Sequence, residues 1–317
     1  MSSRRLVDPQ LLAALAFLPM PEYSMATLAE VRRAADDMAR QTAATGGDVI
    51  TAEYWATAPD GHQIPLIVYT PAGAADDHRP AVLSLHGGGY VLGSAQLNAA
   101  SDRGMASALG GVVVAVDYRL APEAPYPIPL DDCYAALEWL HGQAGPLHID
   151  RERIAVWGDS AGGGLAAAVS LLARDRGEFG VAHQHLIYPM LDDRTCTGEP
   201  HPHAGEFIWN RAANTFAWEC YFGGEAGVEA PAYAAAARAQ DLSGLPSTFI
   251  MVGALDLFVD ENIAFGQRLI RAGVPTELHV FPGAYHAFDR VPRAEVGQIA
   301  RRTSMTALKR ALSPERR

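Results

Sequence analysis

The chain has 317 residues, of which 49% are hydrophobic and 19% are charged, and its formal net charge is −11. The apolar fraction is ample for a large core and excludes an intrinsically disordered protein, and for this length we expect one core with a cap. The negative charge, which no basic patch offsets, argues against nucleic acid and anionic membranes as partners.

The cysteines and the N-terminal residues bear on the cellular location of the protein. Three cysteines are far apart and form no CxxC pair: Cys133, Cys196 and Cys220. They indicate neither a disulfide framework nor a zinc site, so we expect a reducing, cytoplasmic location. Arg4 and Arg5 precede an apolar stretch as in a signal peptide, but Asp8 and Pro9 are typical of a helix start instead. No apolar run approaches the ~20 residues that cross a bilayer.

Two helices and a hairpin are predicted first along the chain. One helix begins at Asp8, and a second runs over about 25–42, where apolar residues recur at helical spacing. Segments 51–56 and 64–69 are separated by Pro59-Asp60-Gly61, which is strong turn chemistry between two extended runs. We therefore expect an antiparallel hairpin whose two strands lie at an edge of the sheet.

From residue 81 the sequence alternates between short apolar runs, turns and helical patterns such as 131–141 and 260–271. This alternation predicts an α/β fold with a mostly parallel central sheet flanked by helices. The apolar runs expected to be strands are 81–85, 112–116, 154–157, 185–188, 248–252 and 277–281.

A long insertion interrupts this alternation between 188 and 248, where about sixty residues contain no apolar strand. Such insertions in compact α/β domains are usually functional, although this one can also serve as a packing layer. We expect 1–45 and 191–235 to form a helical cap over a core made of 46–190 and 236–317. Six aromatic residues cluster in the insertion: Phe207, Trp209, Phe216, Trp218, Tyr221 and Phe222.

The turn after the run 154–157 is a candidate nucleophile site. Gly158-Asp159-Ser160-Ala161-Gly162 fits GxSxG, a strained strand-to-helix turn that leaves no room for side chains two positions from the serine. The helix that follows directs its free N–H groups and positive dipole end at the same spot. By itself the pattern also fits a simple glycine-rich turn.

A second glycine motif makes the nucleophile interpretation more specific. His86-Gly87-Gly88-Gly89 directly follows the run 81–85, and its glycines let the backbone approach a ligand and present N–H groups to it. An HGGG loop combined with a later GxSxG turn is typical of α/β-hydrolase esterases.

That arrangement requires an acid and then a histidine after later strands. Asp256 follows the run 248–252, and His286 follows the next run, so both lie where loops meet the carboxyl edge of the sheet. Asp260 and Glu261 compete for the role of the acid. We interpret Asp260 as the N-cap of a helix and Glu261 as part of its first turn, which favours Asp256.

At this point the sequence resembles the hormone-sensitive lipase-like branch of the α/β-hydrolases. The resemblance covers nearly the whole chain and rests on segments 86–89, 117–123, 158–163, 256–261 and His286. It implies that the backbone N–H groups of Gly88, Gly89 and Ala161 are oxyanion donors, that 117–123 is structural, and that a homodimer through the sheet edge is an option. Leu257 departs from the family, which often has proline after the acid.

The activity expected from these residues is hydrolysis of small-molecule esters, with short to medium acyl chains preferred. Ser160 attacks the carbonyl, His286 transfers the proton and Asp256 orients the imidazole, and no cofactor is required. No metal site is expected, because the paired histidines at 183 and 185 and at 201 and 203 lack a third ligand. Two alternatives stay open: a ligand-binding protein on the same scaffold, and amide, lactone or acyl-transfer chemistry with the same triad.

Overall fold

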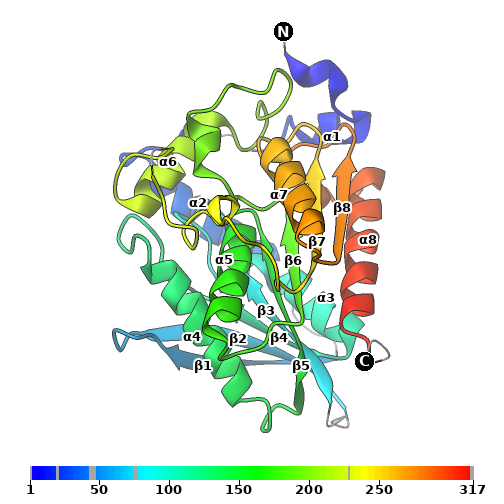
Figure 1. Ribbon diagram of the computed structural model, residues 1–317. Coiled ribbons are helices and arrows are strands. Elements are labelled where there is room, and N and C mark those ends of the chain that lie inside the picture. The colour runs from blue at the N-terminus through cyan, green and yellow to red at the C-terminus, as the bar shows by residue number, and fades with distance from the viewer. Residues whose placement is uncertain (1, 19–20, 43–47, 74–77, 228, 315–317) are drawn as a thin grey trace.

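The computed structural model describes residues 2–18, 21–42, 48–73, 78–227 and 229–314, and these form one twisted sheet between two layers of helices (Figure 1). The strand order is β1-β2-β4-β3-β5-β6-β7-β8. Only the pairs β1–β2 and β2–β4 are antiparallel. The strands are β1 Val49–Thr57, β2 Gln63–Pro71, β3 Arg79–Leu85, β4 Val112–Val116, β5 Ile149–Asp159, β6 His183–Ile187, β7 Ser247–Gly253 and β8 Thr276–Phe281.

The central strands are buried on both faces, which explains their continuous apolar sequences. Every residue of β3, β4 and β6 is buried, as expected for parallel strands covered on both sides. Alternate residues of one strand enter different cores, so that Leu83 packs in one cluster and Val82 in the other. The predicted α/β fold with a mostly parallel sheet is therefore confirmed.

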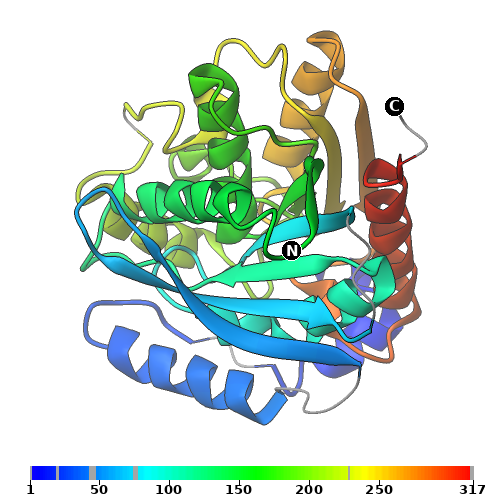
Figure 2. The same cartoon turned by 90° about the horizontal axis from the view of Figure 1, so that it is seen from below.

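Helices α4, α5 and α7 cover one face of the sheet, and α3 and α8 cover the other (Figure 2). None of the helices in the described ranges combines the length and the apolar character that a membrane span needs. The α-helices are α1 Pro9–Ala14, α2 Leu28–Thr42, α3 Ala99–Leu109, α4 Ile128–Gly142, α5 Ala161–Arg176, α6 Arg211–Phe222, α7 Val259–Arg271 and α8 Glu295–Ala311.

The hairpin forms as predicted, but one of its strands is not at the edge. β1 pairs with β2 in antiparallel register and is the edge strand, whereas β2 also pairs with β4 through Leu66–Tyr69 and Val113–Val116. The prediction that both strands are edge strands is therefore wrong for β2. Ile64, Leu66 and Val68 point to one face of the sheet and are buried in the core cluster that includes α4.

The N-terminal segment contacts the loop that follows β8. Asp8 caps α1 as predicted, since its carboxylate accepts a hydrogen bond from the Gln10 N–H at 2.8 Å. The Asp8 N–H donates to the Gly283 carbonyl oxygen at 3.0 Å, and the Tyr285 hydroxyl donates to the Leu11 carbonyl oxygen at 3.1 Å. The segment therefore holds the loop that carries His286. The predicted limit between 45 and 46 lies outside the described residues.

The insertion packs its aromatic residues against the rest of the protein. Its only α-helix in the described residues is α6, where Trp218 and Tyr221 are fully buried. Tyr221 stacks on Tyr90, with ring centroids 4.0 Å apart. Trp209 and Phe207 lie before the helix and are also buried. The division into a cap of 1–45 and 191–235 and a core of 46–190 and 236–317 stays our proposal.

One buried acid makes stability depend on pH. Asp102 of α3 is fully buried, and its Oδ1 accepts a hydrogen bond from the Ser84 hydroxyl at 2.8 Å. Its Oδ2 has no hydrogen-bond partner among the residues that the structure describes. Burial, with a smaller contribution from the carboxylate of Asp159, raises the pKa of Asp102 to about 8, although the bond from Ser84 opposes the shift.

We expect the substitution Asp102→Asn to stabilise the protein increasingly as pH rises. The folded state keeps the Asp102 proton up to about pH 8, whereas the unfolded chain loses it near its ordinary pKa of 3.8. Between these two pKa values the folded state binds more protons than the unfolded chain, so the free energy of unfolding of the wild type falls as pH rises. Asparagine does not titrate, so the variant lacks this fall. Thermal unfolding at pH 5, 7 and 9 measures the difference in Tm. The exposed Asp241→Asn serves as control, and a difference independent of pH for Asp102→Asn would contradict the prediction.

Candidate active site

Ser160 lies on a strained turn between β5 and α5. Its φ of 55° and ψ of −119° place a non-glycine residue in a rarely populated region. The turn needs glycine on either side: a Cβ on Gly158 would lie 2.1 Å from the Gly162 carbonyl oxygen, and a Cβ on Gly162 would lie 2.0 Å from the Leu85 carbonyl oxygen. The two glycines of the motif therefore allow the backbone of the turn to pack directly on itself and on the end of β3.

The three residues predicted as nucleophile, acid and base lie in one hydrogen-bonded chain. Asp256 Oδ2 is 2.8 Å from His286 Nδ1, and His286 Nε2 is 3.0 Å from Ser160 Oγ. Because a carboxylate only accepts, Nδ1 carries the proton and Nε2 is free to accept from the serine hydroxyl. Exposure is 5% for Ser160, 0% for Asp256 and 5% for His286, so bulk water has little access to the chain.

Asp256 is the acid that the fold brings to the histidine. Its Oδ1 accepts a hydrogen bond from the Phe258 N–H at 3.0 Å, which leaves Oδ2 directed at His286. Asp260 is exposed in the first turn of α7. The prediction that Asp260 caps this helix is wrong, because α7 already begins at Val259 after Phe258.

Glu261, the other competing acid, serves a buried structural role. Its carboxylate accepts hydrogen bonds from the Leu191 N–H at 2.7 Å and the Asp192 N–H at 3.2 Å, and the Thr195 hydroxyl donates to it as well. Burial raises the pKa of Glu261 well above its ordinary value despite these bonds. The Glu261 side chain therefore connects the start of the insertion to α7 through hydrogen bonds.

Three backbone N–H groups near the Ser160 turn have no acceptor among the described residues. The N–H groups of Gly88, Gly89 and Ala161 donate to no other group in the described parts of the chain. Gly88 and Gly89 have φ values of 124° and 60°, and Ala161 is the first residue of α5. Free N–H groups in a buried setting are suited to bind a developing oxyanion.

The glycine loop is held by residues that the sequence did not single out for this role. The Gly87 N–H donates to Asp159 Oδ1 at 3.2 Å, and the Tyr118 hydroxyl donates to the His86 carbonyl oxygen at 2.7 Å. The rings of His86 and Tyr118 stack with centroids 4.2 Å apart. Tyr118 belongs to segment 117–123, for which the family resemblance implied a structural role.

An apolar cavity of about 430 Å³ lies beside the candidate site. Trp209 joins the two: its ring centroid is 6.3 Å from that of His286 and 5.2 Å from that of Tyr23. A Cβ on Gly89 would lie 2.4 Å from the Trp209 ring, so the glycine loop and the indole are in direct contact. The cavity is lined by Pro21, Glu22, Tyr23, Thr27, Glu30, Val31, Ala34, Ala35, Leu92, Leu97, Ile208 and Trp209.

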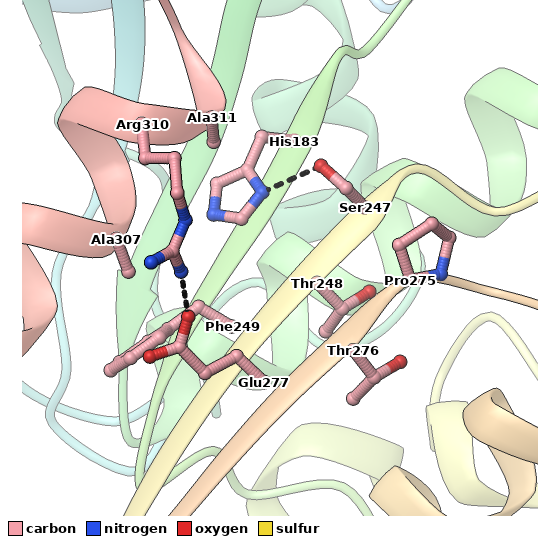
Figure 3. Close-up of a pocket in the computed structure, with 10 residues that line it drawn as sticks. All are labelled: His183, Ser247, Thr248, Phe249, Pro275, Thr276, Glu277, Ala307, Arg310 and Ala311. Atoms are coloured by element: carbon pink, nitrogen blue, oxygen red, sulfur yellow. Dashed lines mark hydrogen bonds and ion pairs between the residues drawn. The ribbon is translucent and has the colours of Figure 1, made fainter.

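The histidine pair at 183 and 185 lies in a different region. His183 is at the amino end of β6, whereas Ser160 follows the carboxyl end of the neighbouring parallel strand. His183 contacts Ser247 at 2.9 Å and His185 at 3.1 Å in a pocket whose rim carries the Glu277–Arg310 ion pair (Figure 3). Within the described ranges, no three His, Cys, Asp or Glu side chains are grouped to hold a metal ion.

Comparison with known proteins agrees with this geometry. A family profile described as the α/β hydrolase fold matches residues 82–290. Esterase LipI of Mycobacterium tuberculosis is 33% identical over 287 residues, which cover 89% of this chain and 88% of the relative. Carboxylesterase NlhH of the same organism is 37% identical over 258 residues, or 78% of this chain and 79% of the relative.

Solved structures give the same result over nearly the whole chain. The structure of a bacterial heroin esterase superposes with a TM-score of 0.90 at 36% identity, covering 98% of this chain and 100% of that one. Esterase LipW from Mycobacterium marinum superposes with a TM-score of 0.86 at 34% identity, covering 98% of each chain. The chain therefore belongs to the α/β-hydrolase fold family, in the hormone-sensitive lipase-like branch that its motifs predicted.

Proposed function

We propose that this protein is a serine carboxylesterase that hydrolyses short- to medium-chain acyl esters. The observation that carries the proposal is the hydrogen-bonded chain from Asp256 through His286 to Ser160. This arrangement of a nucleophile, a base and an orienting acid is typical of enzymes that transfer acyl groups. The relatives named as esterases support the same reaction class.

The acylation step follows from the hydrogen bonds of the site. His286 Nε2 accepts the Ser160 proton as Oγ attacks the ester carbonyl, and the imidazolium then protonates the departing alcohol. Asp256 keeps the proton on Nδ1 and stabilises the imidazolium that forms. The negative charge that develops on the carbonyl oxygen is bound by the N–H groups of Gly88, Gly89 and Ala161, where the loss of one donor typically costs ~10²- to 10³-fold in rate.

The deacylation step uses the same groups in reverse. Water enters after the alcohol has left, and His286 removes its proton as it attacks the acyl-Ser160 carbonyl. The oxyanion forms again at the same donors, and its collapse releases the carboxylic acid and returns the proton to Ser160. Each half of the reaction therefore begins with a neutral imidazole.

The apolar cavity supports a preference for acyl chains of limited length. At about 430 Å³ it lies near the lower end of the range for small-molecule sites. Each methylene buried there contributes ~0.8 kcal/mol until the space is filled. Tyr23, Val31 and Trp209 lie on its walls, so a longer chain must extend into water and gains nothing more.

The Ser160→Ala variant should lose ester hydrolysis by at least ~10³-fold while keeping its fold, because the nucleophile is removed and no large cavity opens. Initial rates with p-nitrophenyl butyrate and thermal unfolding measure the two effects. Ser170→Ala is the matched control: Ser170 is buried in the same helix and bonds only to the Ala166 carbonyl oxygen among the described residues. Wild-type turnover in pure Ser160→Ala would refute the proposed function.

Asp256→Asn should lower kcat by on the order of 10⁴-fold, because an amide can donate to Nδ1 and favour the tautomer that cannot accept the serine proton. Asp260→Asn should leave kcat near the wild-type value, since Asp260 is exposed on the first turn of α7. Steady-state kinetics of both variants measure this contrast. A larger loss for Asp260→Asn would show that Asp256 is the wrong acid.

Among p-nitrophenyl esters from acetate to palmitate, kcat/KM should reach its maximum below about ten carbons, because the cavity is then filled. Val31→Phe narrows the cavity and should move the maximum to shorter chains. Ile270→Phe, at an exposed position of α7, should leave the profile unchanged. A steady rise in kcat/KM up to palmitate would contradict the assignment of this cavity to the acyl chain.

A further inference from the structure

Arg290 connects three loops of the candidate site. It ends the short helix Phe288–Arg290, four positions after His286. One guanidinium nitrogen donates to Asp159 Oδ2 at 2.6 Å and to Asn98 Oδ1 at 2.8 Å. The loop that bears the histidine is thereby tied to the residue next to Ser160 and to the segment before α3.

Asp159, which binds Arg290, also contacts the glycine loop. Its Oδ1 accepts hydrogen bonds from the Gly87 N–H at 3.2 Å and from Asn98 Nδ2 at 2.9 Å. A Cβ added to Gly87 would lie only 2.8 Å from Asp159 Oδ2, so the carboxylate is in direct contact with the loop. Gly88 and Gly89 follow immediately, and any shift of the carboxylate will therefore move the proposed oxyanion donors.

The ion pair between Arg290 and Asp159 is favoured by the groups around it. The side chain of Arg290 is 40% exposed, and against the opposing cost of partly removing the guanidinium from water, attraction to Asp159 raises its pKa above the ordinary value. The Tyr188 hydroxyl donates to Asp289 Oδ1 at 2.9 Å, and the Tyr188 ring packs edge-on against His286 with centroids 4.8 Å apart. Without the guanidinium, the almost fully buried Asp159 carboxylate would lose its ion-pair partner.

We propose that Arg290 is a positioning residue that, through Asp159, sets the oxyanion donors at the correct distance from Ser160. The proposal rests on the proposed esterase function and adds a residue that touches neither the substrate nor the reacting atoms. Its contribution arises because an oxyanion site is effective only when its donors are fixed before the reaction.

Arg290→Met should lower kcat by about 10- to 10²-fold with KM changed less than about threefold, because displaced donors bind the transition state less well while the acyl cavity is unchanged. The affinity for a trifluoromethyl ketone, which forms an oxyanion on Ser160, should fall in parallel with kcat. Arg290→Lys should recover part of the loss, since lysine restores the charge without the planar fork. Rates are expressed per active site, titrated with a fluorophosphonate.

Arg238→Met is the matched control. Arg238 binds the fully buried Asp193 with bonds of 2.6 and 2.9 Å, so it forms a comparable arginine–aspartate pair at the base of the insertion. The control should lose thermal stability and keep its kcat per active site. Wild-type kcat in Arg290→Met, or an equal fall of kcat in the control, would overturn the proposal.

A double-mutant cycle tests whether Arg290 acts through Asp159. Asp159→Asn keeps an oxygen that can accept from Gly87 but removes the charge that binds Arg290, so the effects of the two substitutions on kcat should be strongly non-additive. Additive effects would overturn the proposal, and this variant also provides the test if Arg290→Met does not fold. Failure of the proposed function would appear separately, as unchanged turnover in Ser160→Ala.

Discussion

The close packing of the Ser160 turn against the end of β3 is the constraint on which the site depends. A Cβ on Gly162 would lie 2.0 Å from the Leu85 carbonyl oxygen, so the nucleophile turn and the start of the glycine loop share one rigid backbone contact. This backbone contact is supported by side chains, because Asp159 accepts from the Gly87 N–H and the Tyr118 hydroxyl donates to the His86 carbonyl oxygen. The strained geometry of Ser160 persists because β3, β5 and α5 are buried around it.

The three residues of the hydrogen-bonded chain lie at the carboxyl edge of the parallel sheet. β5, β7 and β8 end at the same edge, so the loops after them bring Ser160 and Asp256 each within hydrogen-bond distance of His286. In the division that we propose, the N-terminal segment and the insertion cover this edge, and Trp209 contacts both the glycine loop and the apolar cavity. Exclusion of water strengthens each electrostatic interaction beneath this cover.

Buried acids around the site have distinct roles that follow from their partners. Asp256 faces an imidazole, Asp159 faces a guanidinium and the backbone of the glycine loop, and Glu261 accepts backbone and hydroxyl hydrogen bonds at the base of the insertion. Asp102 has only the Ser84 hydroxyl among the described residues, and burial raises the pKa of its carboxyl group. Burial also raises the pKa of Glu261, although three donors bind its carboxylate.

The sequence by itself determined the α/β class, the mostly parallel sheet and the motifs around Ser160, because these depend on residues close together in the chain. It also indicated Asp256 and His286, since each follows an apolar run and parallel strands end at a common edge. Only the tertiary structure decided that β2 is an interior strand and that Arg290 binds Asp159, 131 positions earlier. Such contacts depend on the order of strands and the docking of distant loops, and no local pattern of residues encodes them.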